Sequence, residues 1–204
     1  MPSMVLRLFD AAGAQANFDT AGSGIGNCPA LVVDLPAGTY YVQVSAAGSV
    51  TVPAYLLEVR FEGDRGSEVE PNETTLTASV LAGSDSAIFG DHQVLADVDV
   101  YAVTVPAGAS GIRAEIVEGD GTETCESNGI DSYLTLYDSA GSTLTSDDDT
   151  GRGFCSLIDG TGALPLDPSA GGLSPGTYYL EVKRPFSATG ASGLFNYKLV
   201  VTIR

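Results

Sequence analysis

Carboxylate and amide side chains gather in two short segments of the chain. In the first, residues 68–73, acidic residues alternate with other residues, so an extended backbone places their oxygen atoms on one side. The second, Asp-Val-Asp at residues 97–99, opens a predicted strand. Hard oxygen atoms that converge from two segments are the ligands that Ca²⁺ prefers. The predicted calcium ligands are Glu68, Glu70, Asn72, Glu73, Asp97 and Asp99.

The alternative interpretation of these residues is a solvated acidic linker. The chain has 26 Asp and Glu against 9 Lys and Arg, a net charge of −17. Such a surface repels phosphate backbones, which argues against nucleic-acid binding. It favours solubility as well as cations, so charge alone does not decide between the two interpretations.

Motifs for covalent or metal-water catalysis are missing from the sequence. No His-Glu-x-x-His pair or phosphate-binding loop occurs. His92 is the single histidine, and we expect it on a surface loop because no partner for a catalytic pair is visible. The sequence therefore predicts a protein that is not an enzyme.

Two parts of the sequence repeat each other. Residues 6–13, LRLFDAAG, resemble residues 134–141, LTLYDSAG, and residues 35–44, LPAGTYYVQV, resemble residues 173–182, LSPGTYYLEV. Internal similarity of this kind predicts two units of one fold. Each copy is then followed by a predicted hydrophobic strand, at residues 54–61 and 196–203.

The first copy lacks a counterpart of residues 68–131. We therefore expect residues 1–61 to be the trailing half of a β-sandwich repeat, residues 62–67 to be a linker and residues 68–204 to be a complete unit. In this interpretation the chain begins in the middle of a domain. The N-terminal residues also lack the pattern of a signal peptide, so a signal for export would have to come from sequence not present here.

Alternating apolar residues and frequent turn signals predict an all-β protein. Predicted strands include residues 31–35, 87–89, 98–105, 111–117 and 133–137. Tyr40-Tyr41 and Tyr178-Tyr179 each lie in a predicted strand, where successive side chains point to opposite faces. One ring of each pair must therefore face outward, which makes Tyr41 and Tyr179 a possible binding surface. The simpler explanation is that tyrosine is a good strand former.

The three cysteines fit the same repeat. Cys125 and Cys155 flank the predicted strand at residues 133–137, and a bridge between them would contribute about 3–4 kcal/mol on the loop-entropy model. Cys28 follows a loop that matches the one before Cys155, so its partner would lie before residue 1. A free thiol and an intermolecular pairing are the alternatives. Paired cysteines point to an oxidising, extracytoplasmic compartment.

Five motifs follow one another in a fixed order along the chain. An acidic Glu-Pro-Asn segment comes first, followed by an Asp-x-Asp-x-Tyr strand, a Leu-x-Leu-Tyr-Asp hairpin, a Gly-Thr-Tyr-Tyr strand and a Tyr-x-Leu strand. They stand at residues 70–72, 97–101, 134–141, 176–179 and 197–199. In this order they resemble the motifs of the bacterial pre-peptidase C-terminal domain family. The resemblance covers residues 68–204, whereas residues 4–61 match its second half only.

The resemblance implies an antiparallel, jelly-roll-like β-sandwich in a secreted bacterial protein, commonly appended to hydrolases. It also implies calcium at the six acidic and amide positions, by similarity to the collagen-binding domains of clostridial collagenases. The expected function is a non-catalytic extracellular or cell-surface module. Such a module would serve localisation, secretion support or binding of a surface protein or polysaccharide for its parent polypeptide.

A structural role is the alternative. A half-sandwich leaves strand edges and an apolar face exposed to water. Identical subunits could cover them by strand complementation and build an extracellular filament, with Cys28 as a possible bridge between subunits.

Overall fold

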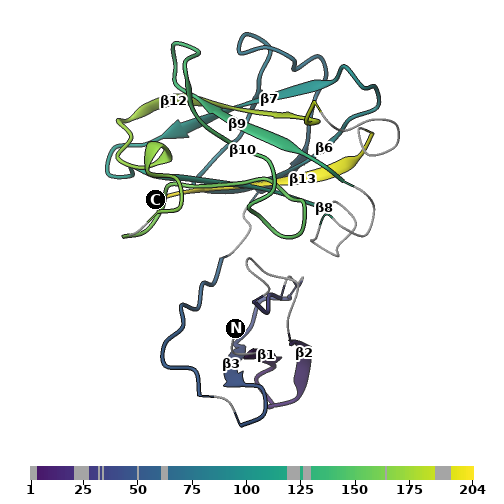
Figure 1. Cartoon of the computed structure of the whole chain (residues 1–204), viewed down its shortest axis with the longest axis vertical. Helices are drawn as coiled ribbons and strands as arrows, with labels where there is room; N and C mark the ends of the chain where they lie inside the picture. Colours follow the sequence, from purple (N-terminus) through teal and green to yellow (C-terminus); the bar gives the residue numbers. More distant parts are fainter. Residues whose placement is uncertain are drawn as a thin grey trace. The chain divides into compact units, whose positions relative to one another are not determined.

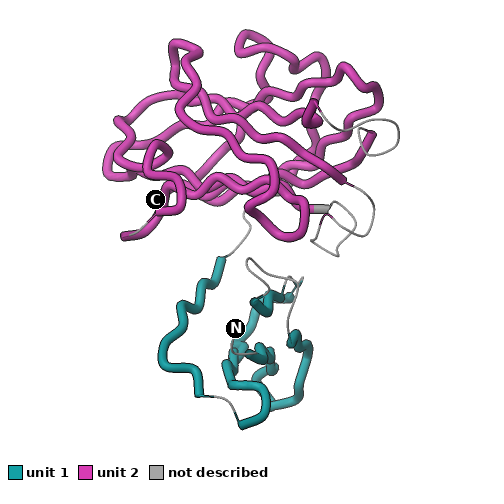
Figure 2. The backbone as a smooth tube through the Cα atoms, viewed as in Figure 1, with its two compact units in different colours: residues 1–60, 121–123 teal, residues 61–120, 124–204 magenta. Residues whose placement is uncertain are grey.

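The computed structural model describes residues 4–20, 28–31, 33, 35–49, 51–60, 64–118, 125, 130–163, 165–186 and 194–204. The chain divides into two compact units, unit 1 from mainly residues 1–60 and unit 2 from mainly residues 61–204 (Figure 2). Within the described ranges the regular elements are strands and a short 3₁₀ turn, η2 (Pro168–Ala170).

Unit 2 is a sandwich of two five-stranded sheets (Figure 1). One sheet has the order β10-β9-β12-β7-β5 and the other β11-β8-β13-β6-β4. The leading half of the unit contributes β4 (Asp64–Ser67), β5 (Ser79–Val80), β6 (Asp85–Asp91), β7 (Val98–Val105) and β8 (Ile112–Glu118). The trailing half contributes β9 (Tyr133–Tyr137), β10 (Thr143–Asp147), β11 (Leu157–Asp159), β12 (Gly176–Lys183) and β13 (Asn196–Ile203). Neighbouring strands run antiparallel, except that β4 joins β6 and β5 joins β7 in parallel.

Both halves contribute strands to each sheet. β12 lies between β9 and β7, and β13 lies between β6 and β8, so each pairs with at least one strand of the leading half. Alternate side chains point into the space between the sheets and form one core. Its fully buried members include Tyr101, Ile116, Leu136, Leu180 and Leu199.

Most strands of unit 2 lie where the sequence predicts them. β7, β9 and β13 have the predicted bounds, and β6 and β8 contain or overlap the predicted segments. The alternation of apolar residues does not predict β4, β5, β10 and β11, which are short or largely polar. The predicted linker at residues 62–67 is wrong for its last four residues, because these form β4 against the edge of β6. Backbone hydrogen bonds make that pairing, so it needs no apolar pattern.

Unit 1 repeats the trailing-half sheet of unit 2. Its strands β1 (Met4–Phe9), β2 (Gln15–Asp19) and β3 (Tyr41–Ala46) have the order β2-β1-β3, which corresponds to β10-β9-β12. The register is also the same. Leu8 faces Val42 and Phe9 faces Tyr41 in unit 1, as Leu136 faces Leu180 and Tyr137 faces Tyr179 in unit 2.

The turns repeat as well. Asp10 Oδ1 accepts hydrogen bonds of 2.9 Å from the amides of Ala12 and Ala14. Asp138 Oδ1 accepts the equivalent bonds, of 2.9 and 2.8 Å, from Ala140 and Ser142. In both copies the turn ends at a glycine of positive φ, 80° at residue 13 and 83° at residue 141, where a side chain would be strained. The tyrosine hydroxyls of residues 40 and 178 each donate to a carbonyl four residues earlier.

Unit 1 departs from the prediction at two segments. The predicted strand at residues 54–61 is wrong, because residues 54–60 form no strand, and residue 61 lies outside the described ranges. The described residues between 31 and 35 form no strand either. The equivalent of residues 54–60 is β13, which pairs on both sides with leading-half strands. The described part of unit 1 has no such strands, so residues 54–60 have no sheet to join.

Cys125 and Cys155 form a disulfide between the end of the leading half and the trailing half. Both are fully buried in unit 2, whereas Cys28 is a free, exposed thiol in unit 1.

We expect equivalent core positions to differ in the stability that they contribute. Leu180→Ala removes a fully buried side chain and should lower the free energy of unfolding by about 2–5 kcal/mol. Val42→Ala, at the equivalent position, which is 43% exposed, should cost less than about 1 kcal/mol. Urea denaturation followed by tyrosine fluorescence measures both. Equal losses would contradict the incomplete burial of the unit 1 sheet.

Candidate metal centre

Residues 68–78 cross from one sheet of unit 2 to the other. The amide of Glu68 donates to the carbonyl of Phe89 on β6 (2.9 Å), and the carbonyl of Asn72 accepts from the amide of Val100 on β7 (2.9 Å). The segment begins at the end of β4 and leads into β5, which belongs to the opposite sheet. It is thus anchored to both layers, and its acidic side chains lie over one end of β7.

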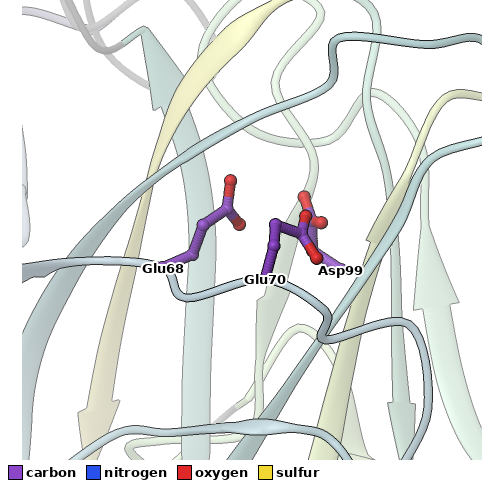
Figure 3. Close-up of side chains that lie close together, drawn as sticks. All are labelled: Glu68, Glu70 and Asp99. Carbon is purple, nitrogen blue, oxygen red and sulfur yellow. The ribbon is translucent and has the colours of Figure 1, made fainter.

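Three carboxylates meet at this crossing (Figure 3). Glu68, Glu70 and Asp99 each place a carboxylate oxygen within 4.8 Å of the others. Asp99, on β7, is fully buried, Glu68 is partly buried and Glu70 is exposed to solvent. The group therefore extends from the interior of the sandwich to its surface.

Asn72 closes the inner side of this group. Its side chain is fully buried, and its Nδ2 donates to Glu68 Oε2 (3.3 Å). Its backbone amide donates to Glu70 Oε2 (2.9 Å). The peptide bond between Glu70 and Pro71 is cis. Through its side chain and its backbone, Asn72 thus contacts two of the three carboxylates.

A chain of buried polar groups continues from the carboxylates into the core. Tyr101 donates from its hydroxyl to Glu68 Oε2 (2.6 Å), and Tyr197 donates to Asp99 Oδ2 (2.5 Å). The two tyrosine oxygens lie 2.6 Å apart. His92 Nε2 lies 3.0 Å from Asp99 Oδ2. These contacts hold the two inner carboxylates in place.

His92 is not the surface residue that the sequence predicts. It is 2% exposed, and its ring stacks on Phe195 at a centroid distance of 4.8 Å. Its amide donates to the carbonyl of Phe195, which draws the end of β6 to the start of β13. Sequence reasoning missed this residue because the aromatic rings packed against it, Phe195 and Tyr197, lie near the other end of the chain, beyond the reach of local patterns.

Burial and neighbouring negative charge raise the pKa of two carboxylates in the centre. Burial, with a contribution from the negative charge of Asp99, raises the pKa of Glu68 above its ordinary value, although hydrogen bonds from Tyr101 and Asp91 oppose that shift. Burial also raises the pKa of Glu70, and repulsion from neighbouring carboxylates, Asp99 first, adds to the shift. Carboxylates in this condition are stabilised by a cation.

Two buried oxygen atoms in the centre have no hydrogen-bond partner among the described residues. They are Asn72 Oδ1 and Asp99 Oδ1. A buried acceptor without a partner costs free energy, and such atoms in a folded protein commonly bind an ion or water. With the carboxylates of Glu68 and Glu70, they make a set of hard oxygen donors suited to a divalent cation such as Ca²⁺.

Two of the six predicted ligands lie outside this group. Glu73 is exposed on the turn that follows Asn72. Asp97 Oδ2 accepts a hydrogen bond from the amide of Gln93 (3.2 Å) and so closes the loop between β6 and β7. Both contribute to the local negative charge that raises the pKa of Glu70.

A second acidic group lies elsewhere on unit 2. Asp131, Asp148 and Asp149 place carboxylate oxygens within 4.8 Å of one another. Burial raises the pKa of Asp148, and repulsion from Asp149 adds to it. The adjacent Asp147 has a structural role, because its Oδ2 accepts from the amides of Thr150 and Leu157.

The predicted surface tyrosines occupy equivalent positions. Tyr41 is 57% exposed and faces Phe9 across the strands, whereas Tyr179 is partly buried and faces Tyr137. Each unit thus has an aromatic cross-strand pair at the same register.

Among the described residues, no helix has the length and apolar character needed to cross a bilayer.

Comparison with known proteins supports the resemblance found in the motifs. Residues 97–184 match the family model described as the bacterial pre-peptidase C-terminal domain. The match includes Asp99, Tyr101 and the disulfide cysteines, and it begins after the segment that holds Glu68 and Glu70. The resemblance to this family is confirmed. A search of curated protein sequences found no match.

Solved structures with similarity to this chain include the pre-peptidase C-terminal domain of a collagenase from Bacillus anthracis. It shares 14% identity over 72% of this chain and 100% of that chain, with a TM-score of 0.36. Aeromonas hydrophila PliG, a periplasmic inhibitor of g-type lysozyme, shares 14% identity over 62% and 97%, with a TM-score of 0.34. A mutant of the Escherichia coli PliG shares 13% over 70% and 100%, with a TM-score of 0.35.

We expect the buried hydroxyl of Tyr197 to be important for stability. Tyr197→Phe leaves the buried Asp99 carboxylate without its hydroxyl donor and should cost about 1–3 kcal/mol in the free energy of unfolding. Tyr178→Phe is the matched control, because that hydroxyl donates to a backbone carbonyl at the surface. Chemical denaturation measures both variants. A Tyr197→Phe loss no larger than that of the control would contradict the proposed network.

Proposed function

We propose that this chain is a non-catalytic, secreted accessory module of a larger polypeptide, and that Ca²⁺ bound by Glu68, Glu70, Asn72 and Asp99 stabilises its complete unit. The observation that carries the metal assignment is the pair of buried, unpartnered oxygens, Asn72 Oδ1 and Asp99 Oδ1, beside two carboxylates of raised pKa. A cation would satisfy those oxygens and offset the repulsion between the carboxylates.

The donor set favours Ca²⁺ over softer metals. All four proposed ligands offer oxygen, whereas softer metals are selected by thiolate or imidazole ligands. His92 contacts Asp99 Oδ2, so we assign it the role of orienting that carboxylate. Because the ligands come from residues 68–72 and from β7, a bound ion would fasten the crossing segment to the sheet.

Two separate features support the accessory role. A disulfide fits an extracellular or cell-surface location, and the family match fits a domain appended to a secreted protein. We propose that the module serves localisation, secretion support or binding of a surface protein or polysaccharide. The aromatic positions Tyr41 and Tyr179, repeated on the two units, are the proposed contact surface.

A second candidate function is structural assembly through the incomplete unit 1. The observation that favours it is the exposure of apolar side chains in residues 54–60. Tyr55, Leu57 and Val59 are 58%, 41% and 59% exposed, whereas their counterparts Tyr197, Leu199 and Val201 are at most 1% exposed. Strands from another polypeptide would cover them, either in an extracellular filament or in a pairwise complex.

Calcium should raise the thermal midpoint of unit 2, and a chelator should reverse the change. A ligand at a hundred times its Kd adds about 2.7 kcal/mol to the free energy of unfolding. Glu70→Gln should abolish most of this gain, because it removes an exposed ligand whose only described hydrogen bond comes from the amide of Asn72. Differential scanning calorimetry with and without Ca²⁺ provides the measurement.

The matched control is Glu73→Gln, which changes a carboxylate that is also exposed but lies outside the group. It should keep most of the calcium response. If the wild-type protein does not respond to Ca²⁺, or if both variants lose the response equally, the proposed site is wrong.

The stability of the metal-free protein should also depend on pH through Glu70. The raised pKa means that the folded state holds this proton more tightly than the unfolded state does. Ionisation of Glu70 therefore lowers the free energy of unfolding as pH rises from below the ordinary pKa of 4.5 through the raised pKa. In chelator, Glu70→Gln should gain stability over the wild type as pH rises from 4 to 8. Urea denaturation across that range tests this, and a difference independent of pH would contradict it.

A further inference from the structure

We infer that unit 1 is an acceptor for the leading half of another unit of the same fold, a polypeptide with the strand pattern of residues 64–118. The free edge of β3 and residues 54–60 form the acceptor surface. This inference rests on the second candidate function and specifies its partner, whereas the calcium proposal for unit 2 stands independently of it.

The first half of the acceptor surface is the edge of β3. In unit 2 the equivalent strand, β12, pairs with β9 on one side and with β7 over its full length on the other. In the described part of unit 1, β3 pairs with β1 alone. Its outer edge therefore offers the hydrogen-bonding groups that bind β7 in unit 2.

The second half is the segment at residues 54–60. In unit 2 its counterpart, β13, lies between β6 and β8 in antiparallel register. The β2-β1-β3 sheet of unit 1 also exposes an apolar side chain that is buried in unit 2. Val42 is 43% exposed, whereas its counterpart Leu180 is fully buried. Strands like β6, β7 and β8 would thus satisfy both surfaces at once.

A second copy of this chain is not the preferred occupant. The described part of each chain contains one complete trailing half in unit 2, part of another in unit 1, and a single leading half, which is already paired inside unit 2. If one copy gave its leading half to unit 1 of another, its own trailing half would be left uncovered. Exchange between identical chains therefore completes no additional sandwich, so the partner has to bring a leading half of its own.

Cys28 supplies an independent marker of the register. Asp19 Oδ2 accepts from the amide of Ala30 (2.9 Å), as Asp147 Oδ2 accepts from the amide of Leu157 (2.8 Å). Each amide lies two residues after a cysteine, so Cys28 stands where Cys155 stands. In unit 2 the partner of Cys155 is Cys125, which follows β8 at the end of the leading half.

A cysteine at the end of the partner segment should therefore come beside Cys28. Oxidised glutathione is the required oxidant: the two protein thiols form one disulfide, and the glutathione disulfide leaves as two molecules of reduced glutathione. Such a bond would form only where the segment docks in the register of unit 2.

The test adds a synthetic polypeptide of residues 64–125 to the full chain. We expect amide hydrogen exchange to slow in residues 41–46 and 54–60, with no change in β12 and β13. With oxidised glutathione present, mass spectrometry of peptide fragments should find a bond between Cys28 and Cys125 of the added segment. The same segment joined ahead of residue 4 by a Gly-Ser linker covers the case of weak affinity, because tethering raises its effective concentration to the millimolar range.

Two variants of the chain separate docking from non-specific contact. Leu57→Lys places a charge on the face that should be covered and should abolish the protection and the bond. Leu56→Lys is the matched control, since a lysine, Lys198, stands at the equivalent position of β13, and it should bind normally.

Three results would overturn the inference. One is the absence of slowed amide exchange and of the disulfide to Cys28, even when the segment is joined to the chain by the Gly-Ser linker. Another is equal capture of a segment of scrambled order. The third is a chain that dimerises through residues 41–60 without any added segment, which would identify a second copy as the occupant. Failure on any of these grounds leaves the calcium response of unit 2 unaffected, so the two proposals fail separately.

Discussion

The structure depends on the pairing, within each sheet, of strands from the two halves of one sandwich. β13 lies between β6 and β8 of the leading half, and β12 pairs along one side with a third leading-half strand, β7. A trailing half therefore cannot satisfy its backbone groups or bury its apolar face alone. Unit 2 contains both halves and has a continuous core, whereas the described part of unit 1 contains three strands of a trailing half and exposes the equivalent side chains.

The candidate metal centre follows from the same arrangement. Glu68, Glu70 and Asn72 lie where the leading half crosses between sheets, and Asp99 lies on β7. Tyr197, which holds Asp99, comes from the last strand of the trailing half. The centre is thus assembled only when the sandwich is complete, and a bound cation would stabilise the assembled state over any partly open one. In unit 1, Tyr55 stands at the position of Tyr197, without an Asp99 equivalent among the described residues.

Local pattern predicts the long strands of this fold because they are half-buried and alternate. It also predicts the repeat, since the turn residues Asp10 and Asp138 make the same hydrogen bonds. It fails for residues 54–60, where the alternation is present but the pairing strands are not. In the site, acidic spacing predicts six ligands, and the structure brings Glu68, Glu70, Asn72 and Asp99 together. Glu73 and Asp97 lie outside that group, because spacing does not reveal which way a side chain turns. The burial of His92 was not predicted, because it depends on contacts distant in sequence.

Amide hydrogen exchange on the unmodified chain distinguishes paired from unpaired strands, because it reports the pairing of each strand separately. We expect strong protection across residues 196–203 and exchange near the rate of an unstructured peptide across residues 54–60, although both segments have the alternation of a strand. Comparable protection of the two segments would show that unit 1 completes its sheets without a partner, and would contradict the account.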